Sequence, residues 1–134
     1  MSAEDFAPGK WDLEKSENFD EYMKALGVGM AMRLIGNKAK PRQEISIKDG
    51  EWTITTSTAL NKVEIKFKPG QPFEEKTADG RNVQTTCTVS GNKLISDQKG
   101  SVDSKIIRDF NKDSFVMTLT ANNVECKRYY KKAD

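Results

Sequence analysis

Two arginines occupy the apolar face of segments that alternate like half-buried strands. Near the C-terminus, Arg128 and Tyr130 fall on the same face as Val124, and earlier in the chain Arg108 shares a face with Ile106. Arginine cannot relieve its burial by losing a proton, so each inward guanidinium needs an anionic or hydrogen-bonding partner. These residues are therefore the first candidates for a binding site.

The register of neighbouring strands determines whether the two arginines meet. If residues 122–123 form a two-residue hairpin turn, Met117 lies opposite Arg128. A short loop at residues 111–114 places Met117 opposite Arg108 as well. The arginines then flank Met117 on adjacent strands, with their backbones about 10 Å apart, a separation from which two guanidinium groups can converge on one anion.

A carboxylate is the ligand that this arrangement favours, because two inward positive charges and the Tyr130 hydroxyl face an otherwise apolar interior. Two alternatives stay open. The arginines take part in an internal ion-pair network, for which Asp79 is the candidate acid, or the face assignment of these strands is incorrect.

The composition argues against most catalytic chemistry and against metal binding. The chain has no histidine, so it lacks the usual general base, the usual activator of a Ser or Cys nucleophile and the commonest metal ligand. Cys87 and Cys126 fall on inward strand faces, where we expect free, inert thiols. We therefore expect no enzyme activity, no cofactor and no metal, with an acyl-lipid enzyme using one of these cysteines as a remote alternative.

Charge and hydropathy set further limits. The 134 residues carry 22 Lys and Arg against 20 Asp and Glu, a net charge of +2, so we expect no nucleic-acid binding. No segment approaches the roughly 18 apolar residues of a membrane-spanning helix, and the N-terminus lacks the apolar core of a signal peptide. We expect a single domain over residues 1–134 that is monomeric and cytoplasmic.

Turn residues divide the chain from about residue 48 onward into short alternating segments. With an initial strand near residues 10–15 and another at 42–48, the segments predict ten strands. The expected fold is mainly β: an antiparallel up-and-down β-barrel of ten strands in two near-orthogonal sheets, which closes its own edges.

One stretch departs from strand periodicity. Apolar residues at helical spacing behind Asn18, with Glu21 three residues further on, predict a capped helix. Gly27 and Gly29 end this helix, and a second one stops at Gly36. The prediction is a helix-turn-helix over about residues 18–36, which covers the barrel as a lid.

Specific motifs then identify a resemblance that extends over essentially the whole chain. The N-terminal run Gly9-Lys10-Trp11-Asp12-Leu13 is followed by Asn18-Phe19-Asp20-Glu21-Tyr22-Met23, Thr77-Ala78-Asp79-Gly80-Arg81 and finally Arg128-Tyr129-Tyr130. This pattern resembles the intracellular fatty-acid-binding proteins, and most of all their heart, adipocyte and myelin branch. The resemblance implies the same barrel and lid.

The resemblance also implies roles for particular residues. The family's carboxylate anchor corresponds to Arg108, Arg128 and Tyr130, the residues that the alternation had selected. The ligand tail and the cavity are implied for Phe19, Tyr22, Met23, Met32, Pro41, Leu60, Asp79, Arg81, Met117 and Leu119. Among these, Leu60 stands at the portal, where the family often has Phe followed by Lys.

The sequence therefore predicts an intracellular carrier that encloses one long-chain fatty acid and delivers it to membranes or partner proteins. A carrier of retinoic acid or of another acidic lipid is the alternative, because the anchor recognises a carboxylate and not a tail. An extracellular lipocalin is disfavoured by the helix pair after the first strand.

Delivery of the fatty acid to a membrane suggests that the lid contacts the membrane transiently. The segment from Tyr22 to Arg42 has five basic residues and no acid. Each basic residue near an anionic membrane contributes about 1 kcal/mol. A merely solvated helix face is the alternative.

Overall fold

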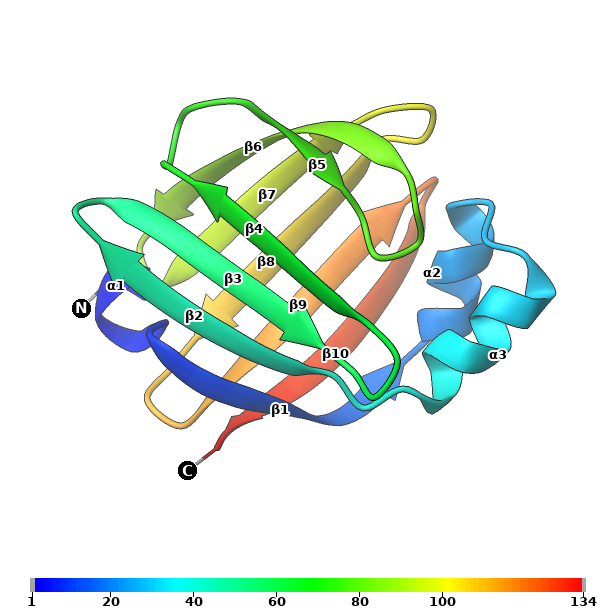
Figure 1. The fold of residues 1–134 in the computed structure, drawn as a ribbon, viewed down its shortest axis with the longest axis horizontal. Helices are drawn as coiled ribbons and strands as arrows, with labels where there is room; N and C mark the ends of the chain where they lie inside the picture. The colour runs from blue at the N-terminus through cyan, green and yellow to red at the C-terminus, as the bar shows by residue number, and fades with distance from the viewer. Residues whose placement is uncertain (1, 134) are drawn as a thin grey trace.

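The computed structural model describes residues 2–133, which contain three helices and ten strands (Figure 1). In chain order these are α1 (Ala3–Phe6), β1 (Gly9–Glu17), α2 (Phe19–Ala25), α3 (Met30–Lys38), β2 (Arg42–Lys48), β3 (Glu51–Ser57), β4 (Lys62–Phe67), β5 (Phe73–Lys76), β6 (Asn82–Ser90), β7 (Lys93–Lys99), β8 (Ser104–Phe110), β9 (Ser114–Ala121) and β10 (Val124–Lys132).

The strands form one antiparallel sheet in the order β4-β3-β2-β1-β10-β9-β8-β7-β6-β5. Figure 1 shows β2 to β4 crossing in front of β6 to β9, so that the sheet curls into the expected barrel. The prediction of ten antiparallel strands in an up-and-down barrel is confirmed.

The sequence predicted a barrel that closes its own edges, but the hydrogen-bond ladder around the barrel is incomplete. Within residues 2–133, β4 and β5 stand at opposite ends of the strand order and do not pair with each other. Their connection contains Pro69 and Pro72, which have no N–H to donate. Side chains line the groove between the two strands, among them Val63, Ile65 and Phe73.

The predicted register around the two arginines is confirmed. Met117 pairs with Arg128 across β9 and β10 and with Arg108 across β9 and β8. Asn122 and Asn123 both have positive φ, as a two-residue hairpin turn requires.

Aromatic packing closes the barrel away from the lid. The rings of Trp11 and Phe115 meet edge to face with centroids 5.2 Å apart, and both side chains are fully buried. The Trp11 indole N–H donates to the carbonyl of Ala7 at 2.9 Å, just after α1. Sequence analysis missed α1, because a helix of four residues is too short to show a helical period.

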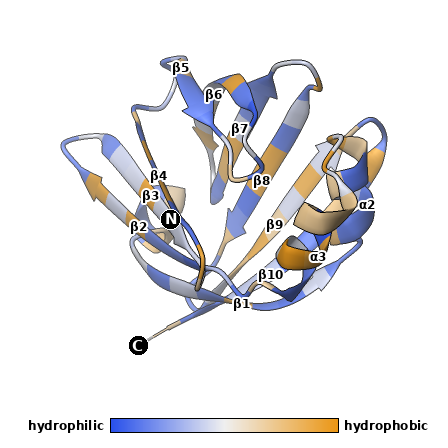
Figure 2. Cartoon of the chain, turned by 45° about the vertical axis from the view of Figure 1, so that its right-hand side comes forward, coloured by the Kyte–Doolittle hydropathy of each residue, from blue (hydrophilic) through white to orange (hydrophobic). Residues whose placement is uncertain are grey.

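At the opposite end of the barrel, α2 and α3 form the lid that was predicted (Figure 1). The helix α2 buries Tyr22 and Met23, whereas α3 buries none of its nine residues. The hydropathy colouring in Figure 2 accordingly shows orange segments on α3, outside the barrel. No helix among residues 2–133 is long and apolar enough to cross a membrane.

Two local predictions for the lid were wrong. The helix α3 continues through Gly36 to Lys38, because Gly36 lies against α2, where a Cβ would come within 2.9 Å of the Met23 sulfur. Asn18 precedes α2 but does not cap it with its side chain. Its φ is positive, and its amide instead donates to the carbonyl of Glu125 at 2.9 Å.

Candidate functional site

A cavity of about 460 Å³ lies inside the barrel below the lid. Its volume is within the range of small-molecule sites. All thirteen residues that the sequence nominated line it, namely Phe19, Tyr22, Met23, Met32, Pro41, Leu60, Asp79, Arg81, Arg108, Met117, Leu119, Arg128 and Tyr130. These residues come from six strands or loops and both lid helices, and only the folded barrel brings them together.

Arg108 and Arg128 enter the cavity from β8 and β10, on either side of Met117. Arg108 is 6% exposed and Arg128 is 8% exposed. The Arg108 Nε donates to the Gln43 side-chain oxygen at 3.1 Å, and the Arg128 Nε donates to the Ser16 hydroxyl at 3.1 Å. Each charge is therefore held by a neutral acceptor.

No acid within residues 2–133 forms an ion pair with either arginine. Asp79, the internal acid considered from the sequence, instead pairs with Arg81 at 2.6 Å. Burial lowers the pKa of the Arg108 and Arg128 guanidinium groups, which means that the protein interior disfavours their charge. An anion placed between them would remove that penalty.

Aromatic rings position Tyr130 and the Arg128 guanidinium. Tyr130 stacks on Phe115 with ring centroids 4.6 Å apart, which holds its hydroxyl on the cavity face of β10. The Arg128 guanidinium lies over the ring of Phe19, 3.8 Å from its centroid, within cation–π distance. Phe19 begins α2, so one contact connects the arginine to the lid.

Another part of the cavity wall is polar, and sequence analysis missed it. One Glu75 oxygen accepts hydrogen bonds from the Thr85 hydroxyl at 2.8 Å and from the Gln98 amide at 3.2 Å. Gln98 in turn accepts from Ser104. Gln43 was missed as well. Strand alternation could have found both Glu75 and Gln43, because they share faces with the apolar residues Phe73 and Ile45.

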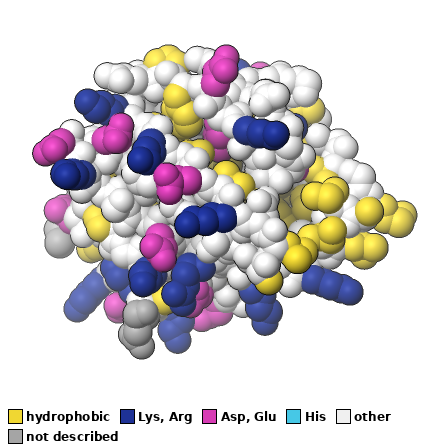
Figure 3. Space-filling view, in the orientation of Figure 1, with side chains coloured by type: hydrophobic (Ala, Val, Ile, Leu, Met, Phe, Trp, Pro, Cys, Tyr) yellow, Lys and Arg dark blue, Asp and Glu magenta, His cyan; other side chains and the backbone are white. Residues whose placement is uncertain are grey.

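The lid region exposes several large apolar side chains, and Figure 3 shows hydrophobic side chains gathered over the helices at its right-hand side. We call Met30, Met32, Leu34, Ile35 and Leu60 the apolar lid patch; their exposed fractions run from 46% for Ile35 to 78% for Leu60. Four of them belong to α3. Leu60 lies across the cavity mouth in the turn between β3 and β4.

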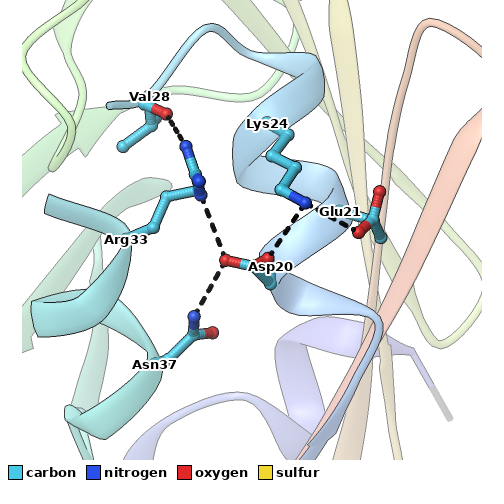
Figure 4. A network of polar contacts seen from close by, with 6 residues as sticks. All are labelled: Asp20, Glu21, Lys24, Val28, Arg33 and Asn37. Atoms are coloured by element: carbon cyan, nitrogen blue, oxygen red, sulfur yellow. Dashed lines mark hydrogen bonds and ion pairs between the residues drawn. The ribbon is translucent and has the colours of Figure 1, made fainter. Parts of the chain in front are cut away.

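The basic residues of the lid are less free than the sequence suggested. Asp20 pairs with Arg33 at 3.1 Å and with Lys24 at 3.6 Å, and it accepts a hydrogen bond from Asn37 (Figure 4). These acids were overlooked because Asp20 and Glu21 precede the segment in which charges were counted.

Arg42 is paired too, with Asp12 at 2.7 Å. Within residues 2–133 only Lys38 and Lys40 of the five have no ion pair. Three of the five basic residues counted in this segment are therefore paired with acids that lie outside it.

The two cysteines are buried and unbonded to each other, as predicted. Burial raises the pKa of both thiols to about 11. A thiol with that pKa is a poor nucleophile at neutral pH. Within residues 2–133 no cluster of three His, Cys, Asp or Glu side chains could hold a metal ion.

A lidded β-barrel around a cavity with two buried arginines can now be compared with known proteins. The model of the lipocalin / cytosolic fatty-acid binding protein family matches residues 8–133. The chain belongs to this family.

Members of the family are similar to this chain over almost its full length. Sodium/calcium exchanger regulatory protein 1 of Doryteuthis pealeii is 52% identical, with 94% of this chain and 96% of that protein covered. A fatty acid-binding protein of Tyrophagus putrescentiae is 43% identical, with 92% and 95% covered.

A solved structure described as the REP1-NXSQ fatty acid transporter superposes with a TM-score of 0.92 at 51% identity, with 95% of this chain and 96% of that chain covered. The resemblance found from sequence motifs is thus confirmed at the level of the family. The heart, adipocyte and myelin branch stays a prediction.

Proposed function

We propose that this protein is an intracellular carrier that encloses one long-chain fatty acid. The observation that carries the proposal is the pair of buried arginines, Arg108 and Arg128, which face one cavity and have no acidic partner within residues 2–133. The fatty acid carboxylate binds between them and the Tyr130 hydroxyl. The names of two of the proteins compared above, a fatty acid-binding protein and a fatty acid transporter, support the same ligand class.

The ligand tail contributes most of the affinity. At about 0.8 kcal/mol per buried methylene, a chain of about fifteen gives an upper limit near 12 kcal/mol. The charged head adds a few kcal/mol at most. The remaining predicted residues, among them Met23, Met32 and Met117, contact the tail, and flexible methionine side chains suit tails of different shape.

Retinoic acid or another acidic lipid stays the alternative ligand, because the anchor residues contact only the carboxylate. An acyl-lipid enzyme is a weaker alternative, since the pKa of each buried thiol is raised and the chain has no histidine to activate it. We propose that the carrier needs no cofactor and acts as a monomer, because one chain supplies all thirteen nominated residues of the cavity. A cytoplasmic location agrees with the family description and with the unpaired cysteines.

The Arg128→Gln variant tests the anchor. We expect it to weaken oleate binding by about 1–3 kcal/mol, the scale of a charge-assisted hydrogen bond, and to leave the binding of oleyl alcohol nearly unchanged. Isothermal titration of both ligands measures this. Arg42→Gln is the matched control, because it removes an arginine whose partner, Asp12, lies outside the cavity. Equal losses for acid and alcohol in Arg128→Gln would contradict the anchor.

For delivery, we propose that the lid contacts membranes transiently through the apolar lid patch. The patch supports a membrane contact because apolar side chains exposed together on α3 are more stable in lipid than in water. Lys38 and Lys40 add attraction to anionic lipid.

Transfer of a fluorescent fatty acid to vesicles tests this contact. Its rate should rise with vesicle concentration and anionic lipid, and should fall in Leu34→Ser and Lys38→Gln. Thr118→Ser, on the barrel face far from the lid in sequence, is the control. A rate independent of vesicle concentration would mean that release into water is limiting and that the lid has no such role.

A further inference from the structure

The turn between β5 and β6 contains a partly buried ion pair whose charges cancel. The Arg81 Nε lies 2.6 Å from one Asp79 oxygen, and the Thr77 hydroxyl donates to the other Asp79 oxygen at 2.6 Å. The Arg81 and Asp79 side chains are only 15% and 20% exposed. The Thr77 N–H donates to the Arg81 carbonyl at 2.8 Å, and Gly80 has a φ of +90°, so the turn is tightly defined.

One hydrogen-bond donor of this ion pair is unsatisfied. The Arg81 Nη1 is buried and has no hydrogen-bond partner, and it is the single buried side-chain nitrogen or oxygen within residues 2–133 of which this is true. An unsatisfied buried donor on a charged group is unfavourable. Arg81 lines the cavity that also contains Arg108 and Arg128. Nη1 therefore favours an acceptor that enters with the contents of the cavity.

The balance of charge indicates which acceptor fits. Asp79 already neutralises Arg81, so a second carboxylate here would bring an uncompensated negative charge into a buried site. An uncharged oxygen has no such cost and satisfies the free donor. The neighbouring wall is polar as well, because Glu75 and Gln98 line the same cavity.

We propose that Arg81 Nη1 binds an uncharged oxygen on the chain of the ligand, so that the cavity prefers fatty acids with a hydroxyl, keto or epoxide group over plain ones. This inference rests on the proposed function, in which the carboxylate bound at Arg108 and Arg128 orients the ligand. Arg81 then contacts a second position along the ligand's hydrocarbon chain. The preference depends on where the oxygen stands, because both contacts must form together.

A positional series tests the proposal on the unmodified protein. Stearic acid and hydroxystearic acids that differ only in the position of the hydroxyl are titrated against it. One position, or two adjacent ones, should bind about tenfold more tightly than stearic acid. The other positions should bind no more tightly than stearic acid, because their hydroxyl does not reach Nη1 while the carboxylate is anchored. A series in which no position exceeds stearic acid overturns the proposal.

A charge-balanced double variant identifies the residue responsible. Arg81→Met with Asp79→Asn removes the free donor and leaves no unpaired acid. The readout is the ratio of the two affinities within each protein: in the double variant the preferred hydroxy acid should bind no more tightly than stearic acid. Arg42→Met with Asp12→Asn is the matched control, because it removes an equivalent pair outside the cavity and should keep the preference.

The outcomes separate this inference from the proposed function. A preference that persists in the double variant overturns the role of Arg81 while leaving a fatty acid carrier. Failure of stearic acid itself to bind the unmodified protein overturns the proposed function, and the inference with it. The positional series alone decides the matter if the double variant does not fold.

Discussion

At the closed end of the barrel, Trp11, Phe110 and Phe115 are fully buried and their rings lie 5.0–5.9 Å apart. At the lid, α3 buries none of its nine residues, and four of them are exposed methionine, leucine or isoleucine. Both regions are rich in apolar side chains. Apolar composition is therefore not what makes a region stable, because only the side chains at the closed end are removed from water.

The exposed helix α3 is joined to α2 by polar contacts that centre on one exposed carboxylate. Asp20 on α2 binds Arg33 and Asn37 on α3, and Arg33 also donates to the Val28 carbonyl at 2.7 Å (Figure 4). Exposed ion pairs contribute little to stability, so this attachment can open while the barrel stays folded. A carrier needs such a difference, because its ligand must enter and leave without unfolding the cavity.

The largest expected effect contrasts the two regions directly. Phe115→Ala should lower the free energy of unfolding by about 3–5 kcal/mol, because it leaves a void among close-packed rings. Leu34→Ala on α3 should change it by less than about 0.5 kcal/mol, because that side chain is already 57% exposed. Urea unfolding followed by tryptophan fluorescence measures both. Similar losses would show that the lid is an integral part of the cooperative fold.

A second effect concerns the thiols of the barrel interior. Because burial raises the pKa of Cys87 and Cys126 to about 11, their thiolate fraction near pH 8 is about a hundredfold below that of an exposed cysteine. A bulky disulfide reagent should therefore react far more slowly with the folded protein than with the protein in urea, and more slowly still with oleate bound. Fast labelling that ignores oleate would mean that both cysteines face outward.

The sequence predicted the positions of the cavity residues better than the contacts of the lid, for a physical reason. Side chains on a strand repeat every two residues, so parity and the two short connections at residues 111–114 and 122–123 were enough to place Arg108 and Arg128 beside Met117. The family motifs supplied the other nominated residues. Nothing comparable fixes the partner of an exposed charge, and so the pairing of Arg33 with Asp20 was not seen.

The other omissions are of the same kind. Helix α1 has too few residues for a periodic signal, and Gly36 looked like a helix end when it permits close packing on Met23. Glu75 could have been found by the alternation in β5, but its hydrogen-bond partners Thr85 and Gln98 lie on β6 and β7, and alternation within one strand does not identify them.

The smallest expected effect concerns the lid attachment itself. Asp20→Ala removes the acceptor of both Arg33 and Asn37, so α3 should detach from α2 more often. We expect the dissociation rate of bound oleate to rise about two- to fivefold, with little change in the urea midpoint. Stopped-flow displacement measures the rate. Glu21→Ala is the matched control, since Glu21 binds Lys24 on its own helix and not α3.

Low pH should accelerate ligand release from the unmodified protein in the same way as the Asp20→Ala substitution. The hydrogen bond from Asn37 lowers the pKa of Asp20, burial opposes this, and the charges of Arg33 and Lys24 lower it further. A lowered pKa in the folded state means that the attachment is intact above the ordinary aspartate pKa of about 3.9 and is lost as the pH falls through the lower folded value. Release of oleyl alcohol, whose own charge does not change with pH, should therefore accelerate below about pH 3.9 in the unmodified protein and much less in Asp20→Ala. An equal acceleration in both proteins would assign the acid response to the barrel and would remove Asp20 as the residue that holds the lid.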